Sequence, residues 1–340
     1  MRKNTLIIML CITFASVMHA EIKLPAIFGD NMLMQQNTAV NIWGKAEANK
    51  TVIIKTSWSK KVIKTVASVS GEWKATFRTP VANGKPQTIS ISDGEMVTLK
   101  NILLGELWLC SGQSNMEMPM KGFKNQPVEN SNMDILNSKN SNIRLFTVKR
   151  NASLIPQNDV TGQWQEASPE TVKEFSATGY YFGRLLNKNL NVPVGLILSA
   201  WGGSSAEAWM SEEILKAFPQ VKIPTSEEGI KDKNRAPTML YNAMIEPLVR
   251  LSMKGIIWYQ GETNYDRANT YTKMFSTLVA GWRKNWALKD TIPFYYCQIA
   301  PYDYSLVTEK GKEVINSAYL REAQMKAETI IPKSGMTVLM

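Results

Sequence analysis

The stretch Glu106-Leu-Trp-Leu-Cys110, followed by Ser111-Gly-Gln-Ser-Asn115, decides the fold class of this chain. Its first five residues form a short apolar run of the kind that is buried on both faces of a parallel sheet. The next five are small and polar, as expected where a strand ends and a helix begins. Gly112 permits a tight turn there, and a serine at position 114 can expose its hydroxyl above the sheet.

Four more runs of this kind follow and alternate with stretches of helical spacing. The runs are 194–198, 255–259, 294–299 and 336–340, and the helical stretches are 178–189 and 271–286. Alternation of strands and helices predicts an α/β fold, in which helices cover a parallel sheet. The polar stretches 125–141 and 225–233 predict loops.

The chain before this region has a different pattern of apolar and polar residues. Short alternating runs at 39–43, 52–56, 71–77 and 87–91 are bounded by turn dipeptides such as Asn83-Gly84 and Asp93-Gly94. Alternation with period two and Asn-Gly or Asp-Gly turns predict antiparallel strands in a small sandwich. We therefore expect an accessory, N-terminal antiparallel β-sandwich-like domain over residues 21–100 and an α/β domain over residues 101–340.

Residues 1–20 have the features of a secretory signal peptide. Arg2 and Lys3 precede the apolar run 6–14, and Ala20 is a small residue at the expected cleavage point. The run is too short to span a bilayer. We expect an exported protein, periplasmic or extracellular, with no integral membrane segment after signal removal. The alternative is that the segment stays attached as an anchor.

Composition excludes several classes of function. With 44% hydrophobic and 20% charged residues, the 340-residue chain is typical of a globular protein. Its net charge of +10 includes no run of five basic residues and no nucleic-acid-binding signature, so no nucleic acid partner is expected. Three Cys without a CxxC pair, and the single His19, predict no metal site and no cofactor. Cys110 and Cys297 are expected to be buried free thiols.

Polar segments that contain glycine follow three of the predicted parallel strands. They are 111–115, 199–205 and 260–264. Because ligands bind outside the carboxyl ends of strands in open α/β sheets, we expect these segments to line one site. A serine flanked by hydrogen-bond donors is what acyl transfer requires, since negative charge develops on the carbonyl oxygen. Ordinary strand-to-helix turns, with Ser114 as an N-cap, are the alternative that the residues alone leave open.

Several motifs closely resemble the sialate O-acetylesterase family of SGNH-type hydrolases. They are Gly112-Gln-Ser-Asn115, Trp201-Gly-Gly-Ser204 and Trp258-Tyr-Gln-Gly-Glu-Thr-Asn264, with further similarity at 24–36, 207–210 and 318–324. The resemblance implies a flavodoxin-like sheet and a secreted carboxylic-ester hydrolase that removes O-acetyl groups from sugars, with sialic acid favoured. A glycan-binding relative without turnover and an acetylesterase that acts on plant polysaccharide are the alternatives.

The resemblance also assigns roles to individual residues. Ser114 is the expected nucleophile, and Trp201 and Trp209 are expected to stack on the sugar, although packing in the core is an alternative for at least one tryptophan. Glu262 is expected either to support a neighbouring side chain or to be a solvated surface acid. The expected oxyanion hole combines the Ser114 N–H, Gly202 or Gly203, and Gln260 or Asn264, with Gln260 favoured because the usual Gly-x-Asn-Asp block reads Gly261-Glu-Thr-Asn264.

The base that would activate the serine is missing from its expected place. In this family it is a His in an Asp-x-x-His block after the last core strand, whereas the sequence stops at Met340 and His19 lies in the signal segment. We expect a fragment or an early-stopped copy of a longer esterase, with weak or absent activity. A short protein that uses another base is the alternative. Lys121 is near in sequence, but seven residues of helix would carry its amine away from Ser114.

Overall fold

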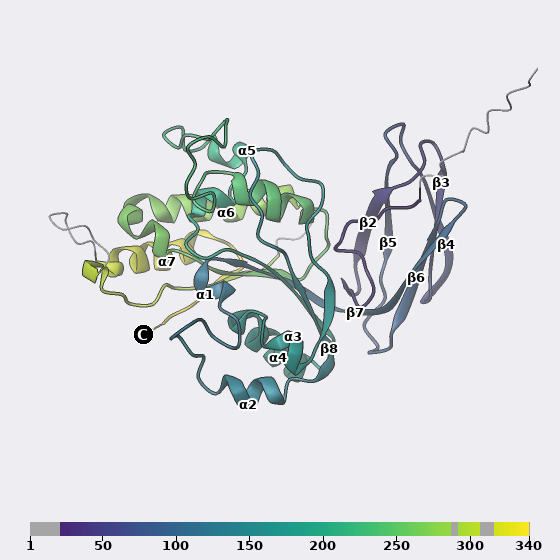
Figure 1. Cartoon of the computed structure of the whole chain (residues 1–340), viewed down its shortest axis with the longest axis horizontal. Helices are drawn as coiled ribbons and strands as arrows, with labels where there is room; N and C mark the ends of the chain where they lie inside the picture. Colours follow the sequence, from purple (N-terminus) through teal and green to yellow (C-terminus); the bar gives the residue numbers. More distant parts are fainter. Residues whose placement is uncertain (1–20, 287–291, 307–315, 340) are drawn as a thin grey trace, which may run out of the picture.

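The computed structural model describes residues 21–286, 292–306 and 316–339. In this part of the chain a central sheet lies between two layers of helices, and antiparallel strands extend from one end of it (Figure 1). No helix among the described residues is both long and apolar enough to cross a membrane. The predicted signal segment 1–20 lies outside the described residues.

The central sheet has the strand order β13-β12-β11-β7-β10-β8-β9. Every pair from β13 to β8 is parallel, and β9 is antiparallel to β8. Without the outer strands β8 and β9, the order is 2-1-3-4-5 in chain sequence, which is the order of flavodoxin. The strands are β7 (Met96–Gly112), β8 (Asn140–Thr147), β9 (Trp164–Ala167), β10 (Val194–Ala200), β11 (Gly255–Tyr259), β12 (Phe294–Cys297) and β13 (Ser334–Thr337).

Helices cover both faces of this sheet. Figure 1 shows α2 (Ser131–Leu136), α3 (Pro169–Val172) and α4 (Ala177–Leu190) on one face, and α5 (Glu212–Leu215), α6 (Ala268–Asn285) and α7 (Ser317–Ile330) on the other. On β7, Leu107 and Leu109 belong to the core beneath α6, whereas Trp108 and Cys110 belong to the core beneath α4. Burial on both faces explains why the strand appears in the sequence as a continuous apolar run.

Short single-turn elements complete the α/β part. They are α1 (Ser114–Glu117), η1 (Ala206–Trp209), η2 (Tyr241–Ile245), η3 (Glu246–Leu248), η4 (Glu262–Arg267) and η5 (Tyr304–Leu306). Three of them, α1, η1 and η4, begin within seven residues of the ends of β7, β10 and β11. Each of these three strands is therefore followed by a tight turn rather than by a long loop.

The N-terminal strands are antiparallel, as the alternation predicts. β2 (Ala39–Lys45) pairs with β5 (Glu72–Arg78), and β4 (Ser59–Val66), β3 (Thr51–Thr56), β6 (Gln87–Ser92) and β7 pair in that order. The first half of β7 pairs with β6, and its second half pairs in parallel with β1 (Leu33–Gln35), β10 and β11. The expected boundary at residue 100 thus falls inside one continuous strand, and a separate sandwich-like domain stays a prediction.

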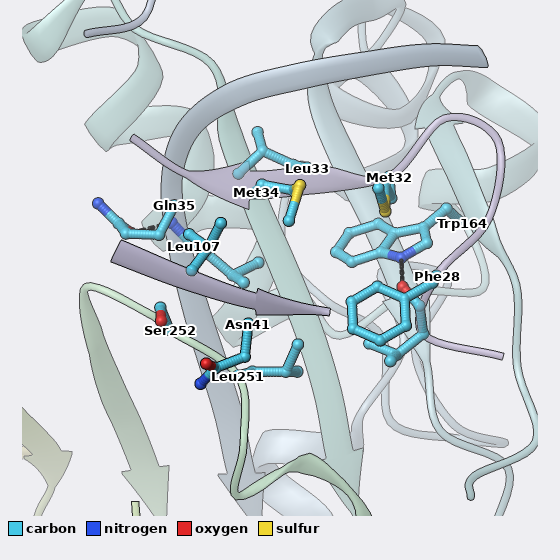
Figure 2. Close-up of a pocket in the computed structure, with 12 residues that line it drawn as sticks. Phe28, Met32, Leu33, Met34, Gln35, Asn41, Leu107, Trp164, Leu251 and Ser252 are labelled. Atoms are coloured by element: carbon cyan, nitrogen blue, oxygen red, sulfur yellow. Dashed lines mark hydrogen bonds between the residues drawn. The ribbon is translucent and has the colours of Figure 1, made fainter. Parts of the chain in front are cut away.

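The two regions meet through an apolar junction, which Figure 2 shows around a small cavity. Leu33 and Met34 from the N-terminal region line this cavity with Leu107 of β7. Met32 lies beside Trp164, whose Nε1 donates to the Ile27 carbonyl at 2.8 Å. Buried residues on both sides of the junction belong to one continuous hydrophobic core. The N-terminal strands therefore pack on the α/β part instead of being joined to it by a linker.

Two expectations about secondary structure need correction. The stretch 125–141 is not only loop, because it contains α2, in which Met133 and Leu136 are exposed and give no apolar face to detect. β13 begins at Ser334 rather than at Met336. The expected helices 178–189 and 271–286 correspond to α4 and α6, and 225–233 contains no helix or strand.

Candidate active site

Three strands end at the same level of the sheet. In the parallel pairings, Gly112 at the end of β7 lies opposite Ala200 of β10 and Tyr259 of β11. The segments that follow these residues begin with Gln113, Trp201 and Gln260. The register therefore brings the three predicted polar segments to one edge.

Gly112 makes the turn that presents Ser114. Its φ is +138°, and a Cβ added to it would lie 2.1 Å from the Tyr259 carbonyl oxygen. The Gln113 N–H donates to that same oxygen at 2.9 Å, so the chain leaves β7 while still bonded to β11. No residue with a side chain fits at position 112 without moving one of the two strands.

Ser114 is the first residue of α1, and its hydroxyl does not cap the helix. The N-cap is Gln113, which makes no capping bond through its side chain. Ser114 is half-buried, and within the described residues neither its Oγ nor its N–H has a hydrogen-bond partner. The N-cap alternative is therefore wrong, and both groups are free to meet a ligand.

The Trp201-Gly202-Gly203 turn packs directly against Ser114. A Cβ placed on Gly202 would lie 3.5 Å from Ser114 Cβ, and Trp201 N–H donates to the Gly112 carbonyl at 3.1 Å. The Gly202 N–H is already used, because it donates to Glu117 Oε2 at 2.7 Å. The Gly203 N–H has no partner within the described part of the chain.

Gln260 is fully buried in the framework of the site. Its Nε2 donates to the Ser204 carbonyl at 3.1 Å and to Asn264 Oδ1 at 2.7 Å, and its Oε1 accepts from Tyr271 OH at 2.9 Å. Both amide hydrogens thus have partners inside the protein. This contradicts the expectation that Gln260 supplies an oxyanion-hole donor.

Asn264 is also buried, and it links the segments that follow β10 and β11. Its Oδ1 accepts from the Ala206 N–H at 3.0 Å, and its Nδ2 donates to Glu207 Oε2 at 2.9 Å. Glu207 in turn pairs with Arg267 at 3.4 Å. One Nδ2 hydrogen has no partner among the described residues, so a donor role for Asn264 stays a prediction.

Glu262 supports Asn115, the residue next to Ser114. Its Oε1 accepts from Asn115 Nδ2 at 2.6 Å, whereas its Oε2 is buried and has no partner within the described residues. Burial raises the pKa of this carboxyl above its ordinary value. Of the two expectations for Glu262, support of a neighbouring side chain fits and a solvated surface acid does not.

The two expected stacking tryptophans differ in position. Trp209 is fully buried, its Nε1 donates to Ser204 Oγ at 2.8 Å, and its ring meets Trp258 edge to face with 6.2 Å between centroids. Its expected role in sugar stacking is therefore wrong. Trp201 is half-buried at the edge of the site, where the Arg150 guanidinium lies 5.6 Å from its ring centroid.

Glu117 and Arg150 are site residues that the sequence reasoning missed. Arg150 follows β8 at the same edge of the sheet, and its Nε donates to Glu117 Oε1 at 2.5 Å. The stretch Ile143-Arg-Leu-Phe-Thr-Val148, in which four of the six residues are apolar, would have marked another strand end, with Arg150 just beyond it. Lys121, considered as a replacement base, instead pairs with Glu174 at 2.7 Å.

Comparisons with known proteins match most of this chain to one family. A family model described as a carbohydrate esterase, sialic acid-specific acetylesterase, matches residues 104–338. The sialate O-acetylesterases of Pongo abelii and Homo sapiens are each 32% identical over 278 residues, which cover 76% of this chain and 52% of theirs. The chain thus spans about half the length of these curated relatives.

A solved structure extends the similarity to the N-terminal region. It is the crystal structure of a carbohydrate acetylesterase from Xanthomonas citri, which is 31% identical and superimposes with a TM-score of 0.82. The match covers 94% of this chain and 69% of that chain. Together with the family model, this likeness shows that the chain belongs to the sialic acid-specific acetylesterase family of carbohydrate esterases.

Proposed function

We propose that this protein is a secreted ester hydrolase that removes O-acetyl groups from sialic acid or a related sugar, with Ser114 as the nucleophile. The observation that carries the proposal is the position of Ser114 at the end of the central strand. Its hydroxyl is unbonded among the described residues, and the Gly202 backbone packs against its Cβ. Export is proposed from the signal-like segment 1–20.

In this proposal Ser114 Oγ attacks the acetyl carbonyl carbon, and the bond between that carbon and the sugar oxygen breaks. The sugar leaves as an alcohol after its oxygen gains the proton that Ser114 loses. An acetyl-serine forms, and water then releases acetate. Negative charge develops on the carbonyl oxygen during attack. The free N–H groups of Ser114 and Gly203 are the candidate backbone donors, and Asn264 Nδ2 is the candidate side-chain donor. Donors of this kind are each worth about 3 kcal/mol of barrier.

The proton of Ser114 needs an acceptor. The 340 residues contain one His, His19, which lies in the segment proposed to be cleaved. Serine hydrolases that lose a triad member keep roughly 10³–10⁴-fold acceleration over water through binding and the oxyanion hole. We therefore expect the 340-residue chain to be acetylated at Ser114 slowly, far below the rate of an enzyme with a complete triad.

Support for an anionic sugar comes from charge at the edge of the site. Arg150 contacts Glu117 through Nε alone, and Arg235 Nε donates to the Gly203 carbonyl at 3.2 Å. Both guanidinium groups are solvent-accessible, and their remaining N–H groups suit a carboxylate. Trp201 adds an accessible ring for a sugar face.

The test is acetylation of Ser114 by p-nitrophenyl acetate, followed as release of p-nitrophenol and as gain of one acetyl group on the Ser114 peptide. We expect both signals in the wild type and neither in Ser114→Ala. Ser276→Ala, which removes a hydroxyl from α6 away from the site, is the matched control and should behave as the wild type. Labelling that survives in Ser114→Ala would contradict the proposed nucleophile.

The same assay separates the alternatives. A wild type that binds acetylated sialic acid but gives no labelled Ser114 would favour a glycan-binding protein without turnover. Faster release of acetate from acetylated xylan or pectin fragments than from O-acetylated sialic acid would favour a plant polysaccharide as the substrate.

A further inference from the structure

Glu117 lies on the same short helix as Ser114, one turn further along, and is largely shielded from solvent. Its Oε2 accepts the Gly202 N–H at 2.7 Å, and its Oε1 accepts from Arg150 Nε. One carboxylate thus connects the helix of the nucleophile, the diglycine turn after β10 and the segment after β8. The oxyanion hole expected from the sequence does not include Glu117 or its contacts.

We propose that Glu117 is a positioning residue, which locks the Trp201-Gly202-Gly203 turn against Ser114 and leaves the Gly203 amide, not that of Gly202, as the donor of this turn. The proposal rests on the function proposed above, because it concerns the same site. It changes which backbone group is expected to hold the oxyanion.

The Gly202 N–H already has an acceptor inside the protein. Hydrogen bonds to a charged acceptor are about twice as strong as those between neutral groups. The Gly202 N–H therefore has a strong partner, and a substrate oxygen would have to displace Glu117 Oε2 to reach it. The Arg150 guanidinium holds the other oxygen of that carboxylate and opposes its displacement.

A hydrogen bond to the Gly202 carbonyl sets the direction of the peptide between Gly202 and Gly203. Asn234 Nδ2 donates to the Gly202 carbonyl oxygen at 2.8 Å. Because a trans peptide directs its C=O and N–H to opposite sides, the Gly203 N–H points away from Asn234. Gly203 has φ +70°, which glycine adopts without strain, and its N–H is unpartnered in the described part of the chain.

Gly202 also lies close to Ser114. Position 202 approaches so closely that an added Cβ would lie 3.1 Å from Glu117 Oε2 and 3.5 Å from Ser114 Cβ. The Gly202 bond to Glu117 therefore fixes the part of the turn that touches Ser114. Loss of this bond would let the turn move relative to the serine without removing any group proposed to contact substrate.

The test compares Glu117→Ala and Glu117→Gln with Glu174→Ala, in which the lost glutamate pairs with Lys121 outside the site. The first readout is the Gly202 amide in ¹H–¹⁵N spectra. We expect its proton to shift upfield and to exchange with solvent about tenfold faster in Glu117→Ala. Glu117→Gln, which keeps an acceptor oxygen, should fall between Glu117→Ala and the wild type, and Glu174→Ala should match the wild type.

The second readout is the kinetics of Ser114 acetylation by p-nitrophenyl acetate. We expect the maximal acetylation rate to fall about tenfold in Glu117→Ala, with the half-saturating ester concentration unchanged and partial recovery in Glu117→Gln. An unchanged Gly202 amide, or a faster acetylation in Glu117→Ala, would overturn the proposal, because the carboxylate would then be idle or obstructive.

The two readouts separate failure here from failure of the proposed function. If Ser114 is not the nucleophile, no variant is acetylated there, yet the Gly202 amide still reports whether Glu117 holds the turn. If Glu117→Ala does not fold, the intermediate amide shift and rate expected of Glu117→Gln carry the test, and wild-type values for both would overturn the proposal.

Discussion

Replacing Gly112 by Ala should destabilise the protein more than either of two matched glycine replacements. Two effects combine at this position. The φ of +138° disfavours any residue with a side chain, and the new Cβ would lie 2.1 Å from the Tyr259 carbonyl oxygen. That oxygen is held by the Gln113 N–H at 2.9 Å, so it cannot retreat without loss of a hydrogen bond.

Each effect has its own control in the same chain. Gly94 has φ +137° with open space around its Cβ position, so Gly94→Ala isolates the backbone strain. A Cβ on Gly105 would lie 2.0 Å from the Pro193 carbonyl oxygen, and its φ is not positive, so Gly105→Ala isolates the clash. Backbone strain of this kind costs about 1–3 kcal/mol, and overpacking costs about 1–3 kcal/mol.

We therefore expect Gly112→Ala to lose about 2–6 kcal/mol of unfolding free energy, close to the combined losses of the two controls. Denaturant unfolding followed by circular dichroism measures each loss as the shift in midpoint multiplied by the slope. A Gly112→Ala protein no less stable than Gly94→Ala would refute the reasoning. It would mean that β7 and β11 separate easily where the site is built.

Three further predictions test buried groups. Glu262→Gln keeps an acceptor for Asn115 and removes a carboxyl whose pKa is raised by burial, so the folded state binds this proton more tightly than the unfolded chain. The variant should gain stability over the wild type as the pH rises above about 4.3, and a gain that does not change with pH in unfolding experiments would contradict this. Trp209→Ala should lose about 3–5 kcal/mol in the same assay, because the indole is fully buried; wild-type stability would rule out a core role. Burial raises the pKa of Cys297 to about 11 and that of Cys110 further, so a thiol reagent at neutral pH should modify Cys297 slowly and Cys110 only on unfolding, and equal labelling of both in the native protein would contradict the burial.

The parallel sheet could be predicted because its strands are buried on both faces. A strand of this kind must be apolar along its whole length, so 106–110, 194–198 and 255–259 are visible in the sequence without any partner. β4 is different, since most of its residues are exposed and include Lys60, Lys61 and Lys64. Its pairing with β3 is made by backbone groups, which leave little trace in residue type.

Whether a polar side chain at a strand end faces the site or forms hydrogen bonds inside the protein could not be predicted in the same way. Proximity to the end of β11 correctly placed Gln260 at the edge of the sheet, but whether its amide turns outward depends on groups distant in sequence. Tyr271 OH, from α6, donates to Gln260 Oε1, and the Ser204 carbonyl, after β10, accepts from Gln260 Nε2. Trp209 is misassigned for the same reason, because the sequence around η1 does not reveal its packing against Trp258 of β11.

The register between β7 and β10 fixes how close the residues of the candidate site lie to one another. Residues along a strand are about 3.3 Å apart, and a slip of one residue also reverses which face each side chain occupies. The 2.7 Å bond between Gly202 N–H and Glu117 exists because Ala200, two residues before Gly202, lies opposite Gly112, two residues before Ser114. A slip of β10 by one position would break that bond and withdraw Gly202 from Ser114. The apolar side chains that fix the register of β7 and β10 therefore also set the geometry of the proposed chemistry, although none of them contacts a substrate in this proposal.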